Sequence, residues 1–201
     1  MIFEPLAYES RKIDPDIDHR KSTFSEINES WIYSGNPKHR YNCRSSTFDG
    51  PIIRSVIEPG LFRSSTFEDK IYDSELNNSE LIGSKFMGSL KNSSLENTDL
   101  RGIVANKIIM QNNSFRGSNL YKAKLNGSDL SGSDLSRTNL EMAEFRNSNI
   151  SNVNFSSAKN LANAIFYNTI VDQNTYEFIW ERFSDRGLIL HTKAQDYFKI
   201  I

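Results

Sequence analysis

The sequence is poor in the residues that build disulfides, metal sites and catalytic centres. Its 201 residues include one cysteine, Cys43, and three histidines, His19, His39 and His191. A lone cysteine excludes an internal disulfide and is typical of a reducing compartment, so we expect a cytoplasmic protein with Cys43 as a plain buried thiol. No histidine has metal-binding partners at a suitable spacing. We therefore predict no metal site and no cofactor.

Several other signals are missing as well. The chain has no glycine-rich phosphate loop, no Gly-x-Ser-x-Gly turn and no Cys-x-x-Cys pair, which speaks against the common enzyme classes. It also has no apolar run of about 18 residues and no basic leader before an apolar stretch, so we expect neither a membrane span nor a signal peptide. Basic and aromatic residues do not interleave as in a nucleic-acid stacking platform. We expect a protein that is not an enzyme and does not bind nucleic acid.

A strict period of five dominates what is present. Large apolar residues recur at every fifth position, namely Phe115, Leu120, Leu125, Leu130, Leu135, Leu140, Phe145, Ile150 and Phe155. A helix repeats every 3.6 residues and a strand every 2, so neither accounts for this spacing. Short fixed periods indicate a solenoid. A solenoid also explains why only 37% of the residues are hydrophobic, since few of the residues in each repeat face inward.

The two residues before each large apolar residue follow a pattern too. The first is small, as at Ser118, Ala123 and Ser128, and the second is usually Asn or Asp, as at Asn119 and Asp129. This stretch resembles the pentapeptide-repeat family. The resemblance implies an all-β solenoid, a right-handed four-sided parallel β-helix, in which the large and the small residue both point inward. Packing supports this, because a narrow bore has room for only one large residue on each side of a coil. Inward hydroxyls would bond the backbone of adjacent coils, and Asn or Asp would suit the bends.

Upstream the rhythm continues with slips. Steps of four residues separate Phe67 from Ile71 and Phe86 from Leu90, and Phe48 with Ile53 forms a weaker start. We place the β-helix at residues 44–171, which gives about six coils and a length of about 30 Å. Between Ile103 and Ile109 apolar residues occupy outward positions, which predicts a bulge or a protruding loop.

The ends of a solenoid expose sheet edges and need caps. We expect residues 1–43 to form an irregular N-terminal arm or cap, with capping contacts from Trp31, Ile32 and Tyr33. Residues 172–201 should form a C-terminal cap or dimer segment. It begins with a short helix from Thr175 to Asp185, with Thr175 as the N-cap. A homodimer would use the apolar side chains of this helix, which are Phe178, Ile179, Trp180 and Phe183.

These features favour a protein-binding module that presents rigid faces to an unidentified protein partner. Well-known members of the resembled family bind DNA gyrase by imitating DNA, which requires a strongly acidic face. Residues 58–100 carry eight acidic against four basic residues, whereas residues 101–171 carry four against eight. The candidate acidic face is therefore Asp69, Asp73, Glu75 and Glu80. The overall charge of −1 weakens the comparison with DNA. The alternative is a structural component of a virion, a secretion apparatus or a pigment–protein complex.

Overall fold

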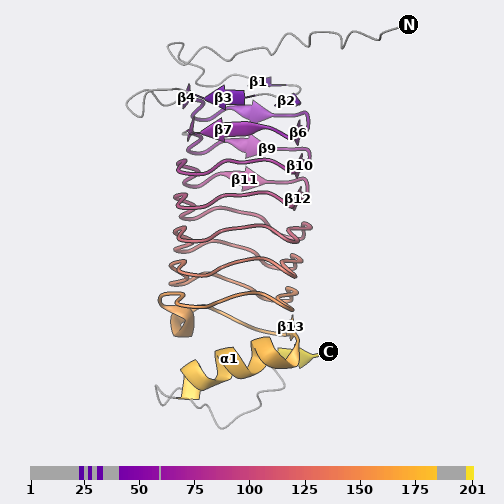
Figure 1. Ribbon diagram of the computed structural model, residues 1–201, viewed down its shortest axis with the longest axis vertical. Coiled ribbons are helices and arrows are strands. Elements are labelled where there is room, and N and C mark those ends of the chain that lie inside the picture. The colour runs from indigo at the N-terminus through magenta and orange to yellow at the C-terminus, as the bar shows by residue number, and fades with distance from the viewer. Residues whose placement is uncertain (1–22, 25–26, 29–30, 34–40, 59, 185–197) are drawn as a thin grey trace, which may run out of the picture.

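The chain winds into a tall coil of stacked rungs, and a helix lies across one end of it (Figure 1). This is a computed structural model, which describes residues 23–24, 27–28, 31–33, 41–58, 60–184 and 198–201. The coil is a right-handed four-sided β-helix, so the fold class predicted from the repeat is confirmed. Among the residues described, no helix has the length and apolar character that crossing a bilayer requires.

Short strands mark the first coils, and all of them pair in parallel. One four-stranded sheet contains, in order, β1 (Thr23–Phe24), β5 (Thr47–Phe48), β9 (Thr66–Phe67) and β11 (Lys85–Phe86). A second contains β2 (Ile27–Asn28), β6 (Ile52–Ile53), β10 (Ile71–Tyr72) and β12 (Leu90–Lys91). Two further pairs are β3 (Trp31–Tyr33) with β7 (Val56–Glu58), and β4 (Tyr41–Asn42) with β8 (Gly60–Leu61). Each sheet thus runs along the rod, one strand per coil (Figure 1).

The paired strands begin upstream of residue 44. β1 to β4 join the same ladders as the coils that follow, and Trp31, Ile32 and Tyr33 pair with residues 56–58. The described part of the segment 1–43 therefore continues the ladders. Beyond β12 the ladders go on as single bridges, for example from Asp99 to Asn119 and from Asn119 to Asn139.

The steps of four residues stack on one side of the rod. The third such step runs from Phe48 to Ile52, because Ile52 is buried and Ile53 is only half-buried. The prediction of Ile53 as an inward residue was therefore wrong. Ile52 pairs with Ile71, and Ile71 with Leu90, so the short steps coincide in successive coils. These coils are 19 residues long, and later coils are 20 residues long.

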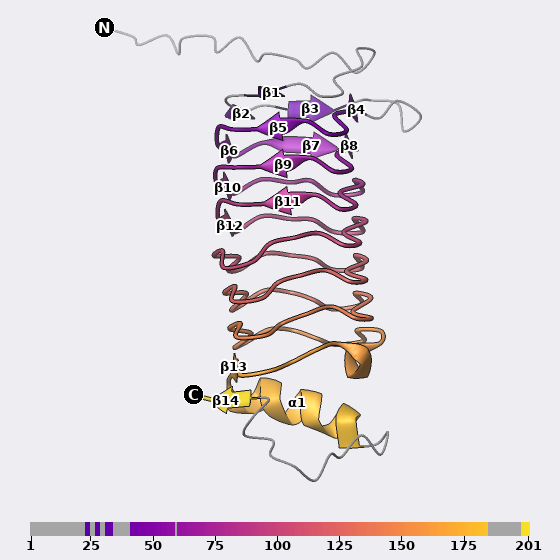
Figure 2. The same cartoon turned by 180° about the vertical axis from the view of Figure 1, so that it is seen from behind.

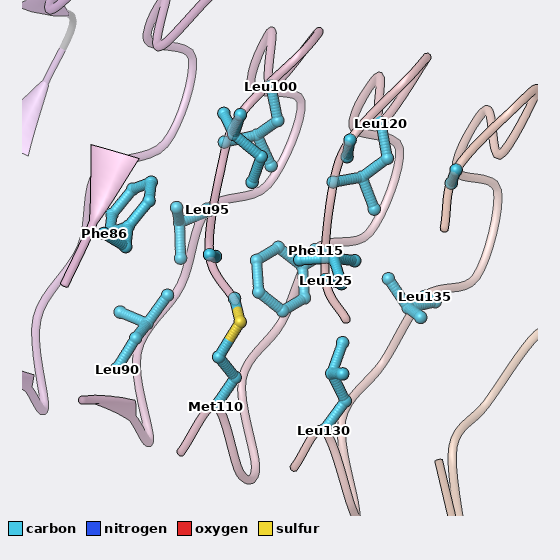
Figure 3. Close-up of a cluster of buried hydrophobic side chains, with 14 of the residues drawn as sticks. Phe86, Leu90, Leu95, Leu100, Met110, Phe115, Leu120, Leu125, Leu130 and Leu135 are labelled. Atoms are coloured by element: carbon cyan, nitrogen blue, oxygen red, sulfur yellow. The ribbon is translucent and has the colours of Figure 1, made fainter. Parts of the chain in front are cut away.

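The inward residues fill the bore as the repeat predicts. Leu120, Leu125, Leu130, Leu135 and Leu140 are each at most 1% exposed. Figure 3 shows members of these rows pointing toward one another inside the coil. Phenylalanines in successive coils stack face to face, and the ring centroids of Phe48 and Phe67 lie 4.7 Å apart. Offset stacking of this kind adds to the burial energy of the core.

Serines occupy the second inward position, and their hydroxyls bond the backbone of neighbouring coils. Ser65 accepts a hydrogen bond of 3.2 Å from the N–H of Ser46 and donates one of 2.6 Å to the carbonyl of Cys43. Ser74 accepts one of 3.1 Å from the N–H of Ser55. These buried hydroxyls form hydrogen bonds with backbone groups that have no partner in the ladders. Cys43, which is 1% exposed, is buried as expected.

The stretch from Ile103 to Ile109 is neither a bulge nor a loop, so that prediction was wrong. Val104 keeps its place in a ladder, pairing with Lys85 on one side and Lys124 on the other. Ile103 fills the second inward position, and Ala105 fills the central one. The large and the small inward residue have exchanged places, which keeps the bore filled without a change of backbone.

The corners depend on a different residue from the one expected. The left-handed conformation occurs two positions after the central residue, for example at Asn97 (φ 53°) and Asn112 (φ 57°). The Asn or Asp before the central residue lies in the ladder, and its side chain accepts from the N–H two residues later. The bond from Ser136 N–H to Asp134, for instance, is 2.8 Å. Asn and Asp tolerate left-handed geometry at low cost, which explains their frequency at the corners.

The coil ends in a short helical turn, a last pair of strands and the C-terminal helix. The 3-10 helix η1 (Leu161–Asn163) takes up the extra residue after Phe155. β13 (Thr169–Val171) pairs with β14 (Phe198–Ile200), and α1 (Gln173–Ser184) lies across the end of the rod in both views (Figures 1 and 2). The helix begins two residues before the predicted Thr175. Its cap is Asp172, whose carboxylate accepts a hydrogen bond of 3.1 Å from the N–H of Thr175.

Candidate functional site

The four apolar residues expected to form a C-terminal contact lie on α1 but do not share one surface. Ile179 is 0% exposed and belongs to the hydrophobic core. Trp180 is 36% exposed and stacks on Tyr176, with ring centroids 5.8 Å apart. Phe178 is half-buried against the core. Phe183 is part of α1, and its side chain lies outside the described residues. Among the members whose side chains the structure describes, Trp180 is thus the exposed one.

An arginine covers one side of Phe178. The guanidinium carbon of Arg182 lies 3.4 Å from the ring centroid of Phe178, and Arg182 donates a hydrogen bond of 2.9 Å to its carbonyl oxygen. Phe178 also lines an open groove of about 310 Å³ between α1 and the last coil, together with Val153 and Phe155. Its polar lining consists of Asn152, Asn154, Asp172, Asn174 and Thr175. A carboxylate and a hydroxyl, those of Asp172 and Thr175, lie in this lining and are hydrogen-bonded to each other.

Asp172 is the ionisable residue of this groove. Burial opposes its ionisation, but hydrogen bonds from Asn152 and Thr175 more than offset burial, and they hold the pKa of the carboxyl below its usual 3.8. Its carboxylate accepts 2.5 Å bonds from the N–H of Asn152 and the hydroxyl of Thr175. Because these donors bind Asp172 to the last coil and to the first turn of α1, its role is structural.

The predicted acidic residues lie around one coil and not along one face. Glu75 and Glu80 belong to different ladders, so they project from adjoining sides of the rod. Asp73, with a φ of 50°, lies at the corner before the side that carries Glu75. Asp69 lies on the short step before Ile71. The four carboxylates therefore do not form one continuous acidic surface.

Two of these carboxylates already have partners. Arg63 pairs with Glu80, and its Nε donates a hydrogen bond of 2.6 Å to the carboxylate. Asp73 accepts a bond of 3.2 Å from the side-chain amide of Asn92. A DNA mimic needs charges that are free to face its partner. The paired state of Glu80 therefore lowers the charge that this coil can offer.

A different surface lies at the middle of the rod, which we call the Met87 patch. It consists of exposed or half-exposed apolar and basic side chains from three successive coils, namely Lys85, Met87, Val104, Lys107, Ile109 and Lys124. Met87 is 64% exposed and Ile109 is 45% exposed. Apolar residues at outward positions between Ile103 and Ile109 are the sequence signal of this surface, although they predict a bulge or a protruding loop there. No sequence signal placed Met87 beside them, because its neighbours belong to another coil.

The ladder fixes the order of the side chains in the Met87 patch. Lys85, Val104 and Lys124 are consecutive partners in one ladder, so the valine lies between the two lysines. Met87 lies two residues after Lys85 on the same side of the coil. Lys107 lies at the corner that ends this side in the next coil, with a φ of 60°. Within the part of the chain that the structure describes, the ion pairs use Arg63, Arg101 and Arg146, and none uses these lysines. The patch therefore presents three lysines around an apolar centre, with Glu68 beside Met87 and Glu144 beside Lys124 at its margins.

The described residues contain no cluster of three or more metal-binding side chains. The three histidines lie outside the described residues. The buried serines are committed to the backbone of the coil, as Ser65 and Ser84 illustrate.

A family model matches the repeated part of the chain. The family model for pentapeptide repeats matches residues 93–132 and 128–172, with 8 copies of the repeat. A search of the curated proteins finds no match. Among solved structures, a trypsin-treated form of QnrB1, a plasmid-mediated fluoroquinolone resistance protein, is 16% identical. The match covers 86% of this chain and 93% of that one, with a TM-score of 0.45.

Two cyanobacterial structures are also similar. HetL from Nostoc, a pentapeptide repeat protein involved in heterocyst differentiation regulation, is 16% identical over 77% of this chain and 89% of its own, with a TM-score of 0.31. Rfr23 from Cyanothece is 23% identical over 48% of this chain and 63% of its own, also with a TM-score of 0.31. The family model thus shows that residues 93–172 consist of pentapeptide repeats, and these residues lie in the four-sided coil that such repeats form.

Proposed function

We propose that the chain is a non-enzymatic, cytoplasmic protein-binding module that presents the side chains of a rigid coil to a protein partner. The observation that carries this proposal is the Met87 patch. The bore is filled by the inward rows, so folding gains little from exposed apolar side chains such as Met87 and Ile109. Met87, Val104 and Ile109 place apolar side chains on two adjoining sides of the rod with lysines around them, and exposed apolar surface rimmed by polar residues is typical of an interaction site.

The rigidity of the coil supports the same function. Each rung bonds the next through its backbone, as in the 2.9 Å bonds from Val104 to Ser84 and from Phe86 to Val104. Side chains on such a frame lose little backbone freedom when a partner binds, and this lowers the entropic cost of association. The patch also lies away from both ends of the rod, where capping would give another reason for apolar residues.

Two alternatives from the sequence have less support. Gyrase binding through DNA mimicry would need the four acidic residues around Asp69 to act together, yet they point in different directions and Glu80 is paired with Arg63. A structural role in a larger assembly is compatible with a rod. However, it does not explain why the exposed apolar residues gather at one corner in the middle of the coil.

Site-specific photocrosslinking in the native host tests the proposal. A photoreactive amino acid at Met87 should give a discrete adduct with a protein. The same amino acid at Met142 is the control, because Met142 is also 45% exposed and lies at a corner in a different part of the rod. No adduct from Met87, or the same adducts from both positions, would contradict a binding site at this patch.

A supercoiling assay separates the gyrase alternative. We expect no effect of the protein on gyrase, with or without a quinolone. Inhibition that disappears on Glu75→Lys and Glu80→Lys and weakens with salt would instead support the acidic surface, because exposed charges are screened over about 10 Å at 0.1 M salt.

A further inference from the structure

We infer that the Met87 patch recognises an extended acidic protein segment in which an apolar side chain lies between two carboxylates. This inference rests on the proposed function and adds the chemistry of the partner. Neighbouring strands in a sheet lie about 4.8 Å apart, so the backbones at Lys85 and Lys124 are about 10 Å apart with Val104 between them. The order of cation, apolar residue and cation comes directly from the ladder.

No single acidic residue of the ladder lies next to both Lys85 and Lys124. The residue before Lys85 in this ladder is Thr66, and the residue after Lys124 is Glu144. Glu144 already accepts a hydrogen bond of 2.9 Å from Asn126 and lies 3.7 Å from the Nε of Arg146. Glu144 thus divides its charge between Lys124 and Arg146, and Lys85 has the neutral Thr66 beside it, so carboxylates of a partner would add complementary charge at this surface.

The other sides of the coil show that this surface is not a requirement of the repeat. At the corresponding ladder position on another side the residues are Ser94 and Ser114, and on a third side they are Asn119 and Asn139. The fold accepts polar residues at such positions without loss. Val104 and the neighbouring Met87 therefore favour a ligand with an apolar group, and methionine adapts its shape to such groups readily.

The apolar centre distinguishes a protein segment from a nucleic acid. Single-stranded nucleic acids bind basic grooves in which aromatic side chains stack on the bases. The Met87 patch has lysines but no aromatic residue, and its centre is aliphatic. An extended segment with a carboxylate, an aliphatic residue and a carboxylate at every second position matches both features, because successive side chains point to opposite faces and alternate ones meet the same surface.

Fluorescence anisotropy with defined probes tests this inference. The probe is a labelled peptide with capped ends. It carries Glu, Leu and Glu at every second position, so that in an extended conformation these three side chains lie on one face. The comparison probes are the same peptide with Lys in place of Glu and a labelled oligo-dT strand. We expect the acidic peptide to bind and the basic peptide not to bind. We also expect binding to weaken as salt rises from about 0.1 M to about 1 M, where the screening length falls from about 10 Å to about 3 Å.

Matched variants locate the site. The pair Lys85→Glu and Lys124→Glu should weaken peptide binding by about tenfold or more, since it reverses both charges that face the carboxylates. The pair Arg116→Glu and Arg137→Glu changes the net charge equally near the opposite side of the rod, where both side chains are exposed, and should leave binding nearly unchanged. Met87→Ser should also weaken binding while keeping the charge. Melting curves of all variants check that the coil is intact, and Lys85→Gln with Lys124→Gln replaces the reversal if that pair does not fold.

Several results would overturn the inference. Equal losses in the two charge-reversed pairs would show non-specific attraction, and tighter binding of oligo-dT than of the peptide would point to nucleic acid. A partner crosslinked at Met87 that has no acidic segment at the crosslink would contradict the chemistry inferred here while leaving the protein-binding function in place. Absence of any crosslink would remove both.

Discussion

The side chain of Asn113 is buried in the bore, and its Oδ1 accepts a hydrogen bond of 2.9 Å from the backbone N–H of Ser93 in the preceding coil. Its Nδ2 donates bonds of 2.8 Å to the carbonyl oxygens of Leu90 and Met110. An amide thus takes the place that serine holds in other coils, and it forms hydrogen bonds to one backbone N–H and two backbone carbonyl groups.

Replacing Asn113 tests the value of this network. Asn113→Leu should lower the free energy of unfolding by about 1–3 kcal/mol, because it leaves the buried N–H of Ser93 and the carbonyl of Leu90 without their side-chain partner, while the carbonyl of Met110 keeps the hydroxyl of Ser133. Asn113→Ser should cost less, since a hydroxyl at this position can still accept from Ser93 as Ser74 does from Ser55. Chemical denaturation measures both. Equal stability of Asn113→Leu and the parent would show that the network is dispensable.

The inward leucines should dominate stability. Leu130 is 0% exposed, and Leu130→Ala should cost about 2–5 kcal/mol through lost burial and a cavity. The exposed Arg137 is the control, and Arg137→Ala should change stability by less than about 0.5 kcal/mol. Thermal melting followed by circular dichroism compares the two variants. A Leu130→Ala protein that melts like the parent would mean that the bore is not the main source of stability.

The short side of the coil depends on a glycine. A Cβ atom on Gly88 would lie 2.2 Å from the carbonyl oxygen of Asp69, so the backbones must separate if a side chain is added. We expect Gly88→Ala to cost about 3 kcal/mol through overpacking. At Gly102, with φ +65°, a Cβ would meet no atom within 4 Å. Gly102→Ala should therefore cost only its left-handed strain, about 1 kcal/mol. The opposite order of the two losses in denaturation experiments would contradict this reading.

The Asp172 cap should make stability depend on pH at the acidic end. Its pKa in the folded protein is lowered, so the stabilisation is present above the usual pKa of 3.8 and is lost as the pH falls through the lowered value. Asp172→Ala should lower stability by about 1 kcal/mol near neutral pH, as loss of an N-cap does. The difference in Tm between parent and variant should shrink in acid. A difference that stays constant down to about pH 2 would show that ionisation of Asp172 does not contribute.

The C-terminal segment should act as a cap. A chain that ends at Val171 loses α1, β14 and the buried side chains of Ile179 and Phe198. The end of the bore and the edge of β13 would then be open, and we expect aggregation or loss of cooperative melting. Size-exclusion chromatography with light scattering measures this. A soluble monomer that melts like the full chain would show that the segment is dispensable.

Trp180→Ala in the full chain separates capping from dimer formation. If two copies associate through α1, the exposed indole of Trp180 belongs to the contact and its loss should favour the monomer at micromolar concentration. A monomer for both proteins would leave the segment with the capping role alone.

Sequence reasoning reached the inward rows because the bore constrains them in every coil. Leu130 and its equivalents can be found from spacing alone, and so can the hydroxyls beside them. The inward residue at the start of the repeat was misjudged, because Ile52 and Ile53 are both apolar and only the stacking with Ile71 selects between them. The cap residue was also missed, since Asp172 and Thr175 are both good N-caps and the last coil decides between them.

The outward surface was harder to predict for a physical reason. A period of five shows which residues face inward and which face outward. The length of each coil decides which outward residues of neighbouring coils lie side by side. Met87 and Val104 become neighbours only when the coil of 19 residues is known. The acidic residues show the same limit, because their closeness in sequence suggested one face whereas the ladders distribute them over several.

The change in coil length also limits how this rod can vary. Coils of 19 residues precede Val104, and coils of 20 residues follow it up to the last coil, which has 21, so two arrays with different cross-sections meet at one seam. A residue gained or lost at a corner is absorbed there, as in the four-residue steps and at η1, and a whole coil can be added to either array without disturbing the rows. Reach can therefore change in steps of one coil while the surface at the seam, which carries Met87 and Ile109, stays intact.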